Sequence, residues 1–355
     1  MEKLYSQEYL DQCRQQQDPL ADAVIAWYFP QRKQELKSVL DMVVDNGFEP
    51  GANMPAAFHQ LYQSVFNSPE LVHQSLIVKG QKFFSAHSSD ILLLLGFLSL
   101  PYCYAAAEGS EVLVRSKRII EEPETRLAET AQFVFDVTAP DAFSVTGKGL
   151  ASILKVRLMH AAVRYYITAS GNWSEAFAPP INQEDMAGTN LSFSLIPIRG
   201  LRKLGKRISA TESMAYIEYW NLIGTLLGIE SGLLPDSTRN AYLLERNIRK
   251  RQFKKSEAGV RLTESLLTYF DKAMKGTNMS GIARPFVAYL MGDVISEKVG
   301  LDVEKTRQQL FQPFAQFLKL RNLLFEKEDS YLAAYKTFLE RQETSGQKVS
   351  LQFKA

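Results

Sequence analysis

Apolar residues recur three and four positions apart along most of the chain, which is the repeat of a helix with one buried face. Stretches in which apolar and polar residues alternate, the pattern of a half-buried strand, are scarce. The pattern predicts helices over residues 18–44 with a break at Pro30, 125–137, 150–169, 212–227, 239–252, 259–273, 284–298 and 303–325. The sequence therefore predicts an all-α fold.

Polar residues at two predicted helix starts agree with this interpretation. Ser68 followed by Pro69 fits an N-cap with proline at the first helical position. Ser209 and Glu212 have the spacing of a capping box. By contrast, residues 171–190 show no helical repeat, so we expect a packed loop there, the longest irregular segment of the chain.

The length and net charge of the chain indicate how many domains and which kind of partner to expect. The chain has 355 residues, of which 46% are hydrophobic, so it can bury a substantial core. We find no tandem repeat and no long Pro/Gly/Ser linker, and we expect a single large domain. The formal net charge is only +2, which gives no reason to expect a nucleic-acid partner.

The number of cysteines and the length of the apolar runs indicate in which cellular compartment the protein is expected. Cys13 and Cys103 are too few for a disulfide framework or a tetrathiolate metal site. The N-terminus lacks the basic-then-apolar layout of a secretory signal. The most apolar run, residues 91–107, is interrupted by Pro101 and is shorter in its unbroken part than the ~20 residues of a membrane span. We therefore expect a cytoplasmic protein without an integral span.

A histidine stands within the apolar stripe of the predicted helix 150–169. His160 shares that stripe with four apolar residues, Ile153, Val156, Val163 and Ile167. Arg157 and Arg164 lie three positions before and four after it, as neighbours on the helix surface. Burial and two adjacent cations both disfavour a protonated ring, so we expect a neutral imidazole, the form that binds metals.

Haem would use all of these groups, because its iron needs a nitrogen and its propionates attract cations. Two plainer interpretations stay open. A lone histidine on an apolar face is often a core residue with its ring nitrogens satisfied by the protein. Arginines beside it could equally pair with structural carboxylates.

Four segments, in this order, resemble the family of the rubber oxygenase (latex-clearing protein) and the mycophenolic acid biosynthesis oxygenase. They are "LPYCYAAAEGSEVLVRSKRI", "RLAETAQFVFDV", "GKGLASILKVRLMHAAVR" and "DMAGTNLSFSLIPIRGLRKLG". The resemblance implies an all-α domain that encloses a b-type haem. It also implies that residues 90–255 form the catalytic core, joined by N-terminal helices in 1–89, C-terminal helices in 256–342 and a flexible tail in 343–355.

The resemblance also implies roles for residues of the histidine helix. His160 matches the family's proximal iron ligand, and Arg157 and Arg164 match the arginines of the same motif. Thr189 matches a threonine that lines the haem pocket. The implied activity is oxidation or cleavage of a double bond in an apolar, isoprenoid-like substrate with dioxygen, and an electron donor as a further partner is left open.

The distal side is expected from a helix that carries Arg126 and Thr130. One departure concerns the position before the threonine, where the rubber-cleaving member has lysine and this chain has Glu129. Its carboxylate could leave the sixth iron site to water, which we favour, bind ferric iron weakly or accept a proton. The plain alternative is a solvated first turn. Glu108 or Glu111 could correspond to the upstream base of the family.

Two other functions remain open at this point. The chain could bind haem as a carrier or redox sensor without turnover, an option that Glu129 keeps open. It could also be a helical interaction module that retains the scaffold and binds no cofactor.

Overall fold

The structure is a computed structural model that describes residues 5–115, 122–276, 280–302 and 330–345. Every regular element within these ranges is helical, apart from an isolated bridge between Ala106 and Phe253. The predicted all-α class is therefore confirmed.

Most consecutive helices are joined by short turns, and longer connections span residues 43–55, 139–148 and 170–182. In the first part of the chain they are α1 (Gln7–Arg14), α2 (Pro19–Tyr28), α3 (Lys33–Met42), α4 (Ala56–Phe66), η1 (Pro69–Val72), α5 (Gln74–Ala86), α6 (Ser88–Leu94), η2 (Leu95–Ser99), α7 (Leu100–Tyr104) and α8 (Ala107–Arg115). In the second part they are α10 (Pro123–Thr138), α11 (Gly149–Ala169), α12 (Gln183–Phe193), α13 (Leu195–Lys203), α14 (Ala210–Leu226), η3 (Ser231–Leu233), α15 (Thr238–Gln252), α16 (Glu257–Ala273), α17 (Ala283–Met291), α18 (Asp293–Lys298) and α21 (Tyr331–Ser345).

Several predicted boundaries are confirmed by the structure. The break expected at Pro30 separates α2 from α3. Ser68 caps η1, which is a 3-10 turn with Pro69 at its start. Ser209 and Glu212 form the predicted capping box at the start of α14.

Two predicted segments are wrong. Residues 171–190 are not one loop, because α12 begins at Gln183, where the Asn182 side chain accepts a hydrogen bond from Asp185 N. Residues 284–298 are not one helix, because Gly292 has a φ of 78° and separates α17 from α18. The predicted helix 303–325 lies outside the described residues. Of the expected tail 343–355, residues 343–345 belong to α21, and the remainder also lies outside the described residues.

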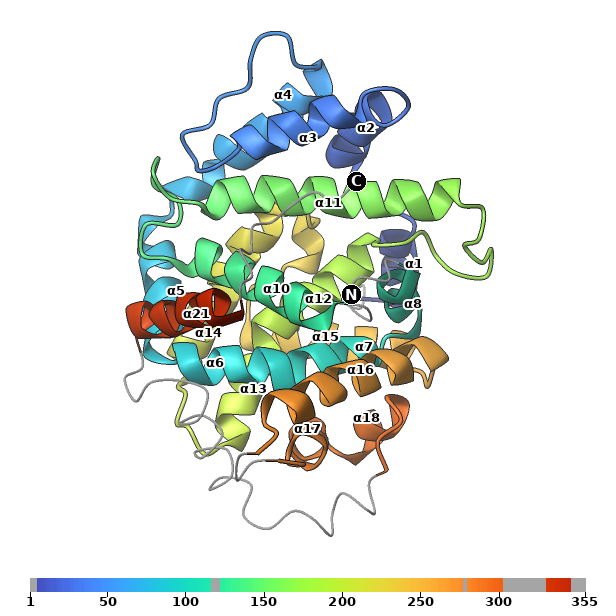
Figure 1. Ribbon diagram of the computed structural model, residues 1–355, viewed down its shortest axis with the longest axis vertical. Coiled ribbons are helices and arrows are strands. Elements are labelled where there is room, and N and C mark those ends of the chain that lie inside the picture. Colours follow the sequence, from blue (N-terminus) through green and yellow to red (C-terminus); the bar gives the residue numbers. More distant parts are fainter. Residues whose placement is uncertain (1–4, 116–121, 277–279, 303–329, 346–355) are drawn as a thin grey trace.

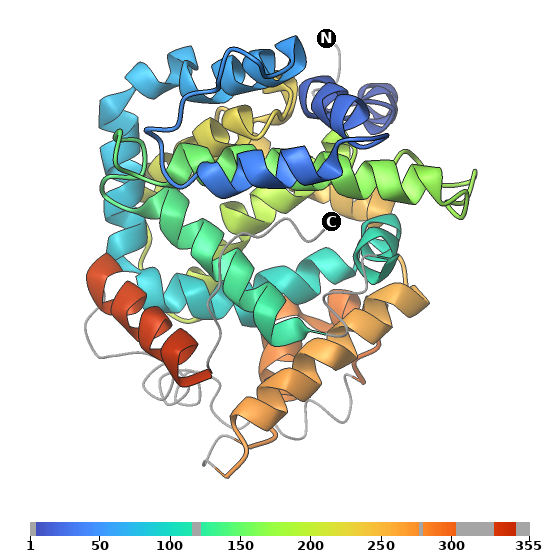
Figure 2. The ribbon, with the colours of Figure 1, turned by 45° about the horizontal axis from the view of Figure 1, so that its top comes forward.

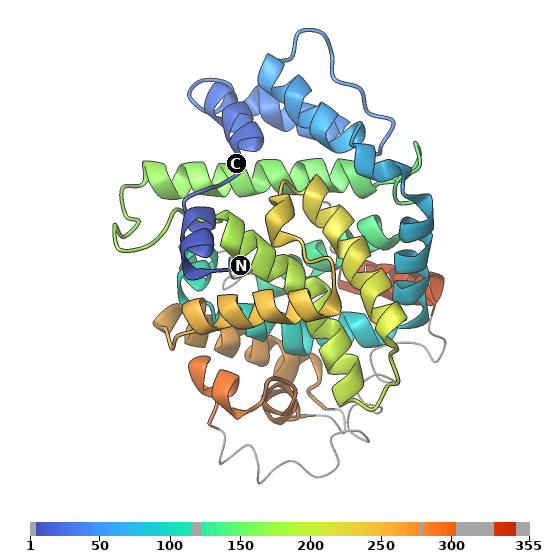
Figure 3. The same cartoon turned by 180° about the vertical axis from the view of Figure 1, so that it is seen from behind.

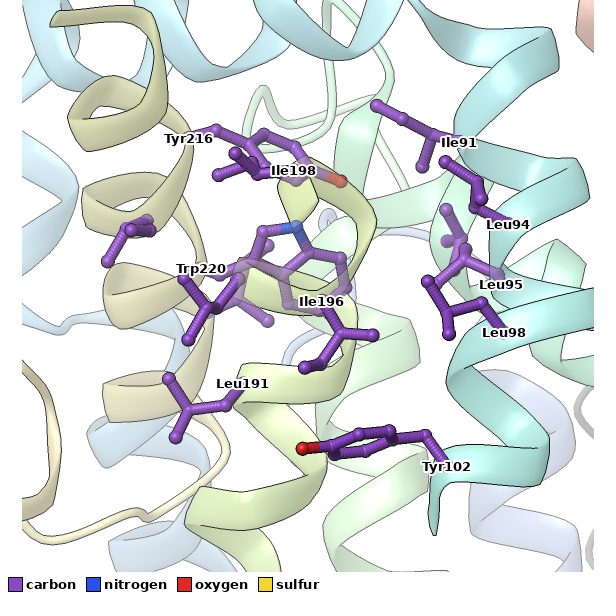
Figure 4. Close-up of a cluster of buried hydrophobic side chains, with 14 of the residues drawn as sticks. Ile91, Leu94, Leu95, Leu98, Tyr102, Leu191, Ile196, Ile198, Tyr216 and Trp220 are labelled. Carbon is purple, nitrogen blue, oxygen red and sulfur yellow. The ribbon is translucent and has the colours of Figure 1, made fainter. Parts of the chain in front are cut away.

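The apolar run 91–107 belongs to the interior. It forms α6, a π-helical turn η2 and α7, and its side chains face α12, α13 and α14 (Figure 4). Trp220 of α14 is only 1% exposed in this cluster. Within the described part of the chain no single helix has the length and apolar character to cross a membrane. Gln74–Ala86 and Ser88–Tyr104 reach that length and composition only when taken together, and they meet at an 80° bend.

The long helix α11 separates two hydrophobic cores. Helices α2, α3 and α4 lie on one side of it and most of the remaining helices on the other (Figures 1 and 3). When this layer is turned forward it lies in front of α11 (Figure 2). Leu154 and Leu158 belong to the core shared with α2–α4, whereas Ile153 and Val156 belong to the main core. Helix α11 is therefore buried on two faces, which leaves few positions for polar groups.

Candidate functional site

His160 lies on the face of α11 that contains Val156, towards the main core. The residue as a whole is half-buried, and the surrounding protein desolvates its ring. Burial lowers the pKa of His160 to about 4, and the charges of Arg164 and Arg126 contribute in the same direction. Among the described residues neither ring nitrogen has a hydrogen-bond partner. The ring is thus neutral at physiological pH, and no described residue engages its nitrogen atoms.

Arg164 is only partly satisfied by the protein. It is 3% exposed, and its Nε donates to Asp22 Oδ1 of α2 at 2.7 Å. Its two terminal nitrogens, Nη1 and Nη2, are buried and have no hydrogen-bond partner in the described part of the chain. Because a buried cationic donor without an acceptor is costly, this guanidinium is suited to an anionic group that comes from outside the protein.

Arg157 differs from Arg164, because all its nitrogens have partners within the protein. Its Nε and Nη2 donate to the two carboxylate oxygens of Asp18, each at 2.8 Å. Its Nη1 donates to Ser64 Oγ at 2.9 Å and to the carbonyl of Leu226 at 3.3 Å. This arrangement favours the alternative that was open from the sequence, in which the arginine pairs with a structural carboxylate.

Helix α10 brings a second charged pair near the histidine. Arg126 affects the pKa of His160, and its Nη1 binds Glu129 Oε2 at 2.6 Å. Glu129 is 4% exposed, so it does not belong to a solvated first turn. Thr130 is half-buried, and its hydroxyl donates to the carbonyl of Arg126 at 2.9 Å.

Thr189 lies inside helix α12 rather than in a loop. Its hydroxyl donates to the carbonyl of Asp185 one turn earlier, at 2.9 Å. Its side chain is exposed although its neighbours Ala187, Asn190 and Leu191 are buried. Thr189 and Asp185 line one side of a cavity between α12 and α8.

The two upstream acids have different surroundings. Glu108 forms an ion pair with Arg14 and accepts a hydrogen bond from Ala178 N at 3.1 Å. Glu111 lies 3.8 Å from Arg115 in an i,i+4 pair on α8. Among the described residues, Glu108 is therefore held by two donors, whereas Glu111 makes one long ion pair.

A buried ionic cluster was missed by the sequence analysis. Arg14 of α1 forms ion pairs with Glu108 of α8 and with two acids at the start of α12, Glu184 and Asp185. Burial, together with the neighbouring charge of Glu184, raises the pKa of Asp185 to about 6 despite the opposing effect of Arg14. The signal in the sequence is weak, because Glu184 and Asp185 look like ordinary acids in the first turn of a helix.

The donor set fits haem. The described residues contain no group of three or more His, Cys, Asp or Glu side chains that could hold a metal ion by themselves. They do provide an unused neutral imidazole and, one turn away, a buried guanidinium with unpaired donors. A cofactor that brings its own ring nitrogens and anionic groups would satisfy both.

The lowered pKa of His160 makes stability depend on pH. Between its ordinary pKa of 6.5 and about 4, the unfolded chain binds a proton that the folded chain does not. Stability should therefore fall as the pH drops through this window, by roughly 3 kcal/mol at most from this group. We expect urea unfolding of the haem-free protein at a series of pH values to show a smaller loss in His160→Leu than in wild type. Equal losses in both proteins would contradict this assignment.

The chain is similar in sequence and in fold to known oxygenases. The family model described as "ER-bound oxygenase mpaB/B'/Rubber oxygenase, catalytic domain" matches residues 88–320. A rubber oxygenase of Streptomyces sp. (strain K30) is 22% identical over 300 residues, which cover 78% of this chain and 72% of that protein. A solved structure of latex clearing protein in the closed state has a TM-score of 0.75 at 19% identity, and the match covers 92% of this chain and 91% of that one.

Proposed function

Because the chain belongs to the ER-bound oxygenase mpaB/B'/Rubber oxygenase catalytic-domain family, we propose that it is a b-type haem-dependent oxygenase. Its substrate would be an apolar, polyisoprene-like chain that is oxidised or cleaved at a double bond. The observation that carries this proposal is the pairing of a neutral, unbonded imidazole at His160 with the unpaired, buried donors of Arg164.

Two residues of α11 would hold the cofactor. A ring nitrogen of His160 would bind the iron, which requires the neutral form that the low pKa provides. The terminal nitrogens of Arg164 would bind a propionate, and Asp22 would keep the guanidinium in orientation through Nε. When bound, haem would supply the iron chemistry that activates dioxygen towards the double bond.

Arg157 contributes indirectly in this proposal. Its bidentate pair with Asp18 fixes α11 against the start of α2, one turn from His160. This contact orients the ligand helix, and it leaves Arg164 as the cation of the motif with free donors.

The groups of α10 and α12 would line the remainder of the pocket. Arg126 and Glu129 hold each other, so they present a nearly neutral pair rather than the amine of the rubber-cleaving relative. We therefore keep the interpretation in which Glu129 does not replace that amine as an iron ligand. The hydroxyls of Thr130 and Thr189 both donate to their own helix backbone, and this leaves their oxygen lone pairs available as acceptors.

Oxygen uptake tests the enzymatic part of the proposal. Haem-loaded protein should consume dioxygen with squalene, an isoprenoid alkene, and release carbonyl products, because dioxygen added across a broken C=C bond yields two C=O groups. Squalane, which has the same carbon skeleton without double bonds, is the matched control and should give no uptake. Tight haem binding with no uptake on squalene would instead support the carrier or sensor function that Glu129 leaves open.

A further inference from the structure

A cavity of about 100 Å³ lies among α7, α8, α12 and α15, on the side of α12 that presents Thr189. Its walls include Cys103 of α7, Gly109 and Leu113 of α8, Gly188 and Thr189 of α12, and Ile248 of α15. Tyr102, Leu191 and Ile196, which are visible in Figure 4, close it on the side of the main core. An apolar cavity of roughly 150 Å³ holds a benzene molecule in another protein, so a cavity of about 100 Å³ is in the size range of a single small hydrocarbon group.

The charged residues at the edge of the cavity are paired with each other or with nearby residues. Asp185 binds Arg14 at 3.1 Å. Glu245 accepts a hydrogen bond from the Tyr102 hydroxyl and binds Arg249 at 2.8 Å. A charged ligand would find no uncompensated charge among these groups, whereas an uncharged apolar ligand would displace no ion pair.

Two glycines determine how much space the walls leave. An added Cβ at Gly109 would meet nothing closer than Ala106 Cβ at 3.9 Å, so a larger side chain there would extend into the cavity. An added Cβ at Gly188 would touch Ile248 Cγ2 at 3.4 Å, which is van der Waals contact. Neither glycine has a positive φ, so the lack of a side chain rather than the backbone conformation is what the cavity requires.

We propose that this cavity binds one branched alkene unit of an apolar substrate, and that Gly109 and Gly188 set the size of the unit it accepts. The identity of the ligand as substrate rests on the oxygenase function proposed above. Binding to the cavity can be measured without haem or turnover, because Cys103 lines it and reports on its occupancy.

The experiment uses the full-length chain with Cys13→Ala, which leaves Cys103 as the single thiol. Burial raises the pKa of the Cys103 thiol to about 11, so its reaction with methyl methanethiosulfonate should be slow and easily followed by mass spectrometry. Trimethylethylene, an alkene the size of one isoprene unit, should slow the modification at least about threefold. Tetramethylammonium, a cation of similar size, should leave the rate unchanged.

Substitutions on both walls provide the second arm. Gly109→Leu and Gly188→Leu should each slow modification of Cys103 without added alkene and remove the further protection by trimethylethylene. Arg246→Leu, on the exposed face of α15, is the control and should behave like the parent. Urea unfolding of each variant checks that the variant is folded. Gly109 and Gly188 lie on different helices, so either leucine variant tests the cavity by itself if the other does not fold.

The outcomes separate this inference from the proposed function. Equal rates with and without trimethylethylene, or equal protection by the cation, would overturn the cavity assignment even if haem-loaded protein oxidised squalene. Protection by trimethylethylene that the leucine variants abolish would establish the binding site even if no oxygen were consumed. If haem-loaded Gly109→Leu and Gly188→Leu both oxidised squalene at the parental rate, Gly109 and Gly188 would have no role in substrate size.

Discussion

Protein that carries His160→Ala is expected to lose haem, with an affinity that falls by more than about 100-fold. The loss of a group that only orients a metal ligand costs about 10–100-fold, and removal of the ligand itself should cost more. The ring of His160 is neutral and makes no hydrogen bond to the described residues, so its nitrogen atoms are available to bind iron. Titration of haem into both proteins, followed through the Soret band, measures the difference.

Two controls make the result specific. His73→Ala removes a histidine whose side chain is 57% exposed, and it should leave the Soret band unchanged. Free imidazole should partly restore the band in His160→Ala, because the deleted ring leaves space for it. A Soret band of unaltered position and strength in His160→Ala would remove His160 as the iron ligand.

Arg157→Met is expected to lower the free energy of unfolding by about 3–5 kcal/mol. Asp18 is 3% exposed, and both of its carboxylate oxygens accept from this arginine, so the substitution would leave a buried charge without its partner. The cost comes from that carboxylate rather than from lost haem contacts, and it should therefore appear in the haem-free protein. Urea unfolding at neutral pH is the measurement.

A double variant tests this explanation. Asp18→Leu combined with Arg157→Met replaces the ion pair by apolar side chains, and most of the lost stability should return. Haem affinity per folded molecule should change little in Arg157→Met. A variant that kept its stability but lost haem would instead support a role of Arg157 in binding a haem propionate, as expected from its position beside His160.

Some features of the site could be predicted from sequence because they are local. The spacing of His160 and Arg164 on one helix fixes their proximity, and the neutral state of the imidazole follows from burial and neighbouring charge. The partners of the arginines were not predictable. Asp18 lies 139 positions from Arg157, and no periodicity links two helices that meet only in the folded chain.

Helix α12 was missed for a different physical reason. Its residues Met186, Asn190 and Ser192 are all buried, so the helix has no polar face and the sequence shows no amphipathic repeat. Asp185 is half-buried and Thr189 is exposed on the remaining part of the helix surface, which is too narrow to produce a polar repeat in the sequence. Gly292 shows the opposite case, in which one residue with a positive φ divides a continuous apolar pattern.

The contacts between α2 and α11 have a consequence for how reactivity is adjusted. Asp18 and Asp22, one turn apart at the start of α2, form ion pairs with Arg157 and Arg164, which lie on either side of His160. These two ion pairs connect the position of α2 to the turns of α11 on both sides of the imidazole. Substitutions on the outward surface of this layer would therefore be a way to shift the His160 ring without changing any side chain next to it.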